Sequence, residues 1–260
     1  MKIKTKLLLI IAVSILFSCR NSKELIYLND AANNEMLKGI TQEYIIKSGD
    51  ILYVSIKSMN PEVNTLFNPE SNMEVGGGSY GYQKYSTPSS AYLYGFEIDP
   101  DGNLKLPMLG KINLLGTPIS KVEGIVQKKA DEFLNDAIVK VKLLNYKVTV
   151  TGEVRSPGTF YNYNNSITVI EAIALANGNT DFASIKNVMV VRSFPEGNKA
   201  YSLDLSSKKI YLSEAFYLQP NDYVIVQPDK YKNFQLNSQA YSLMFSSISI
   251  LLAVLGFVLK

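Results

Sequence analysis

Apolar and polar residues alternate along much of this 260-residue chain, and that pattern predicts half-buried β-strands. The alternation is clearest at 138–144, where Lys140 and Lys142 separate the apolar positions, and it recurs at 147–153. Turn-forming residues such as those at 48–50 separate the apolar runs. Further strands are predicted at 43–47, 51–57, 95–99, 104–106, 159–161, 187–192, 200–205 and 223–227.

Two stretches show the spacing of an amphipathic helix instead. The first has Thr117 as its predicted N-cap and Pro118 at the first helical position. Its apolar face comprises Ile119, Val122, Val126 and Phe133. The second helix begins at a capping box formed by Thr168 and Glu171.

Strands and helices in this order predict an α+β fold with two units, at 43–144 and 145–230. In the second unit a helix follows two strands and further strands come after it, which favours a β-grasp-like sheet. Residues 76–94, inside the first unit, break the periodicity as an insertion rich in glycine and tyrosine. Its tyrosines are Tyr80, Tyr82, Tyr85, Tyr92 and Tyr94. They could contact a glycan or a partner, or belong to a mobile loop, and both interpretations stay open.

Composition excludes most catalytic chemistry. The chain has no histidine and one cysteine, so it cannot form a Ser-His-Asp or Cys-His catalytic group, or a zinc site of the usual kind. A glycosidase built on two carboxylates is conceivable, but no spacing of acids supports one. We therefore expect no catalytic residues, no metal site and no cofactor.

The net charge of +3 comes from one end of the chain. Lys2, Lys4 and Lys6 account for the whole excess, and the remainder is formally neutral. A neutral chain lacks the basic surface that binds phosphate backbones. Nucleic acid is therefore not an expected partner.

The first eighteen residues predict a signal peptide, with a cationic start and an apolar run at 7–17. The run ends in LFSC at 16–19, which resembles a bacterial lipoprotein signal and implies that acyl chains such as palmitate are attached to Cys19. An ordinary secretory signal with an incidental cysteine is the alternative. Residues 19–42 would then form a lipidated tether, and Arg20 favours the outer membrane because it is not an acidic retention residue.

The C-terminal region, 231–260, carries an uncharged apolar run at 243–259. That run predicts a transmembrane helix. Small residues recur on one face of it at spacings of three and four: Ser242, Ser246, Ser249, Ala253 and Gly256. This small-residue stripe predicts helix packing against other copies, or a face that lines a lumen. A single-pass anchor with incidental serines is the remaining alternative.

Four motifs in order resemble one family. YIIKSGDIL at 44–52 and IDPDGNLKLP at 98–107 are similar to the polysaccharide biosynthesis/export domain. VTGEVRSPG at 150–158 and YVIVQP at 223–228 are similar to an SLBB module, a β-grasp ligand-binding domain. Together with the lipoprotein signal and the terminal helix, they resemble the Wza-like outer-membrane polysaccharide export lipoproteins.

The resemblance implies a lipid-anchored protein whose bulk lies in the periplasm. Copies would form a ring, an octamer in the best-known member of the family, through which a capsular polysaccharide or exopolysaccharide passes without catalysis. An inner-membrane polysaccharide copolymerase, often coupled to a tyrosine kinase, would be the partner below. The alternative function is a glycan-binding periplasmic lipoprotein that forms no channel.

Overall fold

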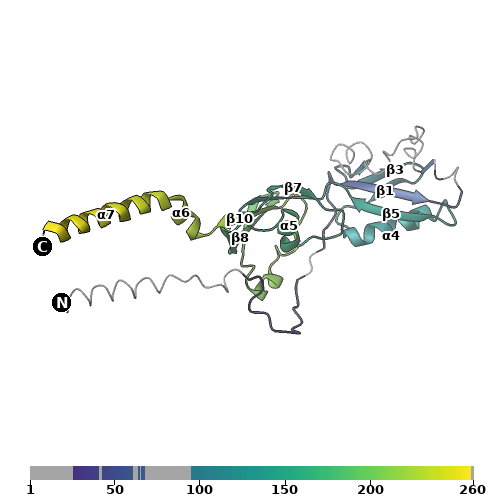
Figure 1. The fold of residues 1–260 in the computed structure, drawn as a ribbon. Helices are drawn as coiled ribbons and strands as arrows, with labels where there is room; N and C mark the ends of the chain where they lie inside the picture. The colour runs from purple at the N-terminus through teal and green to yellow at the C-terminus, as the bar shows by residue number, and fades with distance from the viewer. Residues whose placement is uncertain (1–25, 41–42, 61–63, 65, 68–94, 259–260) are drawn as a thin grey trace.

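The computed structural model describes residues 26–40, 43–60, 64, 66–67 and 95–258. The fold is α+β, as predicted. The first unit lies at one end of an elongated molecule, the second unit lies in the middle, and the two C-terminal helices extend from the other end (Figure 1).

A three-stranded antiparallel sheet forms the first unit. Strand β1 (Ile51–Lys57) lies between β2 (Phe96–Glu97) and β5 (Ile138–Leu143). Helix α4 (Ile119–Ala130) packs against this sheet. Its buried side chains are Val122, Val126 and Ala130, so Val122 and Val126 face the core as predicted. Phe133, which was predicted on the same face, lies beyond the end of the helix and is 52% exposed.

Side chains of α4 also cover the outer edge of β5. The backbone N–H of Val139 donates to Gln127 Oε1 at 2.9 Å, and the backbone N–H of Val141 donates to Glu123 Oε2 at 3.3 Å. Gln127 Nε2 donates in turn to the carbonyl of Ala137 at 2.8 Å. These amides would otherwise be open to pairing with another strand, so the helix closes this edge of the sheet.

Three local predictions in the first unit are wrong. The segment 43–47 is not a regular strand; it makes one isolated bridge, from Ile45 to Pro118. The turn residues at 100–103 predict a hairpin between 95–99 and 104–106. Strand β3 (Asn103–Leu106) instead pairs mainly with β4 (Gly110–Asn113), and a single bridge joins it to residue 98. The N-cap of α4 is Pro118 and not Thr117, and no side chain caps this helix, because proline has no side-chain acceptor.

The second unit is a five-stranded sheet in the order β7-β6-β10-β8-β9. All neighbouring strands are antiparallel except β6 and β10. Helix α5 (Val169–Leu175) contacts β6 and β10. The strands are β6 (Lys147–Gly152), β7 (Gly158–Tyr161), β8 (Ala183–Phe194), β9 (Gly197–Leu203) and β10 (Tyr223–Pro228).

The capping box that begins α5 is confirmed. The backbone N–H of Glu171 donates to Thr168 Oγ1 at 3.2 Å, and the backbone N–H of Thr168 donates to Glu171 Oε2 at 2.7 Å. Two free amides at the helix start are thus satisfied reciprocally. Asn177 and Gly178 follow the helix with φ of 59° and 76°, which ends it in the left-handed conformation.

Part of the predicted tether packs on the second unit. Residues 26–40, called the N-terminal strap below, pair through Leu28 N–H with the carbonyl of Leu205 at 3.0 Å. Asp30 accepts from Ser207 Oγ at 2.7 Å and from the backbone N–H of Lys208 at 2.6 Å, where the 3₁₀ helix η3 (Lys208–Leu212) begins. The strap is therefore part of the folded body.

Helices α6 (Lys230–Leu236) and α7 (Ser238–Val258) end the described chain. None of the helices in the described part of the chain combines the length and the apolar character needed to cross a membrane. The predicted C-terminal transmembrane helix is therefore wrong. Serine, glutamine and tyrosine recur through the first half of α7, and its longest run without hydroxyl or amide side chains is 250–258. That run rises about 14 Å as a helix, against about 30 Å of hydrocarbon.

Candidate functional site

The predicted site residues fall into two groups. Cys19 and the five tyrosines of the insertion, Tyr80, Tyr82, Tyr85, Tyr92 and Tyr94, lie outside the described residues. The small-residue stripe lies on α7, and all five of its members are exposed. None of the hollows described below is lined by a residue of this stripe.

The serines of the stripe are bonded within the helix. Ser246 Oγ donates to the carbonyl of Ser242, and Ser249 Oγ donates to that of Phe245, each at 2.8 Å. Such bonds satisfy the hydroxyls locally and leave the face smooth. Apart from its chain neighbours and the backbone of its own helix, nothing lies within 4 Å of the position a Gly256 Cβ would take, so this face has room for a partner.

The junction between the units is built on a buried carboxylate. The Tyr44 hydroxyl donates to both oxygens of Asp50, at 2.9 and 3.0 Å, and the Tyr44 ring centroid lies 6.4 Å from that of Tyr146. Asn145 accepts from the backbone N–H of Ile51 at 3.1 Å. Burial raises the pKa of the Asp50 carboxyl, against the opposing hydrogen bonds from Lys47 and Tyr44. These contacts fasten the start of the second unit to the first.

Both ends of the described chain attach to one corner of the second unit. The Tyr27 hydroxyl, in the strap, accepts from Asn179 Nδ2 at 2.7 Å. Lys232, in α6, forms an ion pair with Glu153, and Thr180 Oγ1 donates to the same carboxylate at 2.6 Å. An isolated bridge between residues 154 and 179 holds the two attachment points together.

Glu153→Gln should loosen α6. The hydrogen bond from Lys232, and then that from Thr180, lower the pKa of Glu153. The stabilisation is therefore present above the ordinary glutamate pKa of about 4.3 and is lost as pH falls through the lowered value. Because Lys232 is partly exposed, we expect a loss of about 1 kcal/mol, measured by hydrogen exchange of the α6 amides at neutral pH.

The matched control for this change is Glu132→Gln, which breaks an exposed pair with Lys129. It should leave exchange in α6 unaltered. Equal protection of α6 in the Glu153→Gln variant and the unchanged protein would contradict the role of this ion pair.

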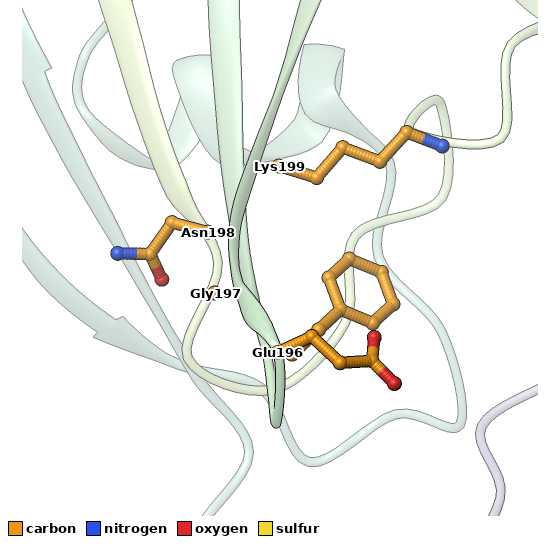
Figure 2. Close-up of a pocket in the computed structure, with 5 residues that line it drawn as sticks. Glu196, Gly197, Asn198 and Lys199 are labelled. Carbon is orange, nitrogen blue, oxygen red and sulfur yellow. The ribbon is translucent and has the colours of Figure 1, made fainter.

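In the described part of the chain, two hollows on the second unit are large enough to consider as sites. One, of about 370 Å³, lies at the tip of the β8–β9 hairpin, around Phe194 and residues 196–199 (Figure 2). Its lining comes from a single hairpin, and Lys199 is already bonded to Glu214 at 3.2 Å. A hollow made by one turn offers few convergent groups, so we assign it no function.

The other hollow is a groove of about 570 Å³ between the loop at 161–167 and residues 171–175 of α5, called the 161–175 groove below. Tyr161 and Tyr163 lie in its wall. Burial, and then the neighbouring Tyr161, raise the pKa of the Tyr163 phenol. The loop also borders the junction, because Tyr163 lines a small cavity with Tyr44.

Within the described residues, no group of three or more His, Cys, Asp or Glu side chains could hold a metal ion. The most deeply buried ion pair among the described residues is Arg192–Asp222, which ties β8 to the loop before β10. Such a pair organises the fold and leaves no charge available for substrate chemistry.

Comparison with known families assigns both units. Residues 38–144 match the polysaccharide biosynthesis/export protein family, and residues 146–226 match the SLBB domain. The first unit therefore carries a polysaccharide biosynthesis/export domain, and the second carries an SLBB domain. The resemblance stated from the motifs is thereby confirmed. The family match ends, and the SLBB match begins, at the Asn145–Tyr146 junction described above.

Two curated relatives share 41% identity with the chain, and both are named EPS I polysaccharide export outer membrane protein EpsA. The relative from Ralstonia nicotianae (strain ATCC BAA-1114 / GMI1000) aligns over 62% of this chain and 41% of its own length. The relative from Ralstonia solanacearum aligns over 31% of this chain and 22% of its own. The chain thus covers less than half of either relative.

Sequence reasoning missed the ion pairs and the 161–175 groove. Glu153 and Lys232 are 79 positions apart, and Arg192 and Asp222 are 30 apart. No local pattern joins such residues. The groove did leave a signal, because YNYNNS at 161–166 alternates phenols with amides immediately after a strand.

Proposed function

We propose that this protein is a subunit of the outer-membrane apparatus that carries a capsular polysaccharide or exopolysaccharide to the cell surface. The ordered pair of family matches over 38–144 and 146–226 carries the proposal. The names of the two relatives support both the export role and the outer membrane. The subunit acts passively, as a conduit without catalysis.

The proposed anchor is a lipid on Cys19, at the outer membrane, with the folded units in the periplasm. The strap supports this arrangement, because it runs from residue 26 onto the second unit and would carry an anchored end directly to it. Mass spectrometry of the mature N-terminus tests the anchor. A diacyl or triacyl cysteine is expected, and an unmodified Cys19 would refute the proposed lipid anchor.

The proposed assembly is a closed ring of copies, with α7 packing against α7. Large apolar side chains on this helix are exposed, among them Leu243 at 71% and Phe257 at 85%. An exposed apolar face of this kind calls for a partner surface, and the ring supplies it with a second copy. An inner-membrane polysaccharide copolymerase is the proposed partner below the ring.

Light scattering and single-particle imaging of the full-length protein in detergent test the assembly. A closed ring with a central cavity is the expected result. A stable monomer would instead favour the second candidate, a glycan-binding lipoprotein that forms no channel, for which the 161–175 groove is the supporting observation. Deletion of the gene should also stop secretion of the polysaccharide.

Gly256→Leu or Ser249→Leu should weaken the assembly at least about tenfold, because bulk on the small-residue stripe keeps the helices apart. Leucine favours a helix more than glycine does, so the loss in Gly256→Leu cannot come from a weaker helix. Light scattering across a concentration series measures the effect.

Ser247→Leu is the matched control, since Ser247 lies off the stripe and makes the same kind of bond, from its Oγ to the Met244 carbonyl at 2.8 Å. It should assemble normally. Unchanged oligomer size in both stripe variants would defeat packing through this face.

A further inference from the structure

Internal hydrogen bonds fix the conformation of the loop that forms one wall of the 161–175 groove. Asn162 is buried, and its side chain holds the backbone of Asn164 from both sides. Asn162 Oδ1 accepts from the Asn164 N–H at 3.1 Å, and Asn162 Nδ2 donates to the Asn164 carbonyl at 2.9 Å. A fixed loop loses little conformational entropy when a ligand binds, which is the property of a preorganised site.

The walls of the groove combine apolar surface with hydroxyl and amide groups. Tyr163 is 41% exposed and Leu175 is 48% exposed, so both present apolar surface to a ligand. Asn164 and Ser166 add donors and acceptors at the exposed rim. A pyranose ring has the matching character, with C–H faces that pack on aromatic rings and hydroxyl groups around its edge. The volume of about 570 Å³ lies within the range of about 300–1,000 Å³ for small-molecule sites.

The charge of the groove favours uncharged glycans over acidic ones. Among the described residues that line it, Glu171 is the sole charged side chain, and its Oε2 accepts from Thr168 Oγ1 at 2.8 Å. Lys147 lies opposite Tyr161 in the β6–β7 register, outside the lining. A uronate or phosphate on the ligand would find no cation within the groove and would face a carboxylate.

We propose that the 161–175 groove binds an uncharged stretch of polysaccharide, with the Tyr161 and Tyr163 rings packing on the sugar faces and Asn164 and Ser166 bonding the hydroxyl groups. This inference names the class of glycan that the exported polysaccharide presents to the protein, and it rests on the proposed export function. One wall of the groove borders the junction of the two units, because Tyr163 also lines the small cavity that contains Tyr44.

Binding of defined oligosaccharides to the full-length protein in detergent tests the site. The probes are neutral hexasaccharides of glucose and mannose and, for comparison, hexagalacturonate, measured by titration calorimetry and saturation-transfer NMR. Saturable binding of at least one neutral probe is expected, at least about tenfold tighter than hexagalacturonate. Absence of saturable binding by every neutral probe, or a preference for the acidic probe, would overturn the proposal.

Tyr163→Ala should weaken neutral binding about tenfold, whereas Tyr163→Phe keeps the ring and most of the affinity. Ala174→Leu, at an exposed position of α5, narrows the groove without removing a contact and should also weaken binding. Tyr223→Ala is the control, since Tyr223 is 50% exposed on the same sheet, away from the groove. If Tyr163→Ala and Ala174→Leu both bind like the unchanged protein, the site lies elsewhere.

These measurements separate the groove from the proposed export function. Oligosaccharide binding is read on purified protein, while export is read from ring formation and polysaccharide secretion. If the protein is a monomer that binds neutral sugar through Tyr163, the channel proposal is refuted and the 161–175 groove remains a binding site. If the protein forms a ring and exports polysaccharide, but no binding depends on the groove, the export function is retained and the binding site is refuted.

Discussion

Arg192→Ala is expected to lower the free energy of unfolding of the second unit by about 3–5 kcal/mol, because it leaves a buried carboxylate without its partner. The two side chains are 4% and 1% exposed. Arg192 Nη2 donates to Asp222 Oδ2 at 2.8 Å and to the Tyr217 carbonyl at 3.0 Å, so the same guanidinium also satisfies the loop before β10. Removing it leaves several acceptors unpaired at once.

Chemical denaturation of the full-length protein, monitored by circular dichroism, measures the loss. Lys199→Ala is the matched control, since it breaks the Lys199–Glu214 pair, in which both side chains are more than half exposed. That change should cost less than about 1 kcal/mol. Equal losses in the two variants would mean that the buried pair contributes no more than a surface pair.

The parts of the fold that follow from local chemistry were predictable. The capping box of Thr168 and Glu171 was found because its two partners are three positions apart and each satisfies the other. Strand β1 was found because ILYVSIK at 51–57 is a short run rich in apolar residues directly after a turn. Where a prediction needed a partner, it failed: β3 forms its main hairpin with β4 and not with 95–99, and nothing in its sequence ranks the two neighbours.

The buried carboxylates also show which features local sequence predicts and which depend on distant partners. Ser48-Gly49-Asp50 was recognised as a turn, and Gly49 has the φ of 83° that such a turn requires. The burial of Asp50 under Tyr44 was not recognised, because a carboxylate in a turn is ordinarily solvated. The 221–222 turn is similar. Asn221 has a φ of 69°, which asparagine in a turn tolerates, but no local pattern indicates that Asp222 is buried against Arg192.

The C-terminal helix was predicted as a helix for a sound reason and assigned to a membrane for a weaker one. An absence of charge is consistent with a span, but hydroxyls at every third or fourth position are equally consistent with a face that meets another protein surface. Ser242, Ser246 and Ser249 direct their hydroxyls to carbonyls of their own helix. The stripe therefore presents only small side chains with no unbonded serine hydroxyls, which allows another helix to approach closely.

Gly152→Ala should destabilise the second unit by about 2–5 kcal/mol, because it adds backbone strain to a steric clash. Gly152 has a φ of 88°, and a Cβ atom there would lie 2.1 Å from the carbonyl oxygen of Val226. Gly152 pairs with Val226 where β6 meets β10, and the same carbonyl accepts from the Glu153 N–H at 2.8 Å. Relieving the clash must therefore separate the two strands or displace Glu153.

The displacement would reach the root of the C-terminal helices, since Glu153 holds Lys232 of α6. We expect Gly152→Ala to lower the midpoint of denaturation and to expose the α6 amides to hydrogen exchange together. Gly158→Ala is the control on the neighbouring strand: its Cβ would meet nothing closer than the Phe160 ring at 3.8 Å, and the change should cost less than about 1 kcal/mol. If Gly152→Ala unfolds at the same denaturant concentration as Gly158→Ala, the close approach of β6 to the Val226 carbonyl is not a constraint on this fold.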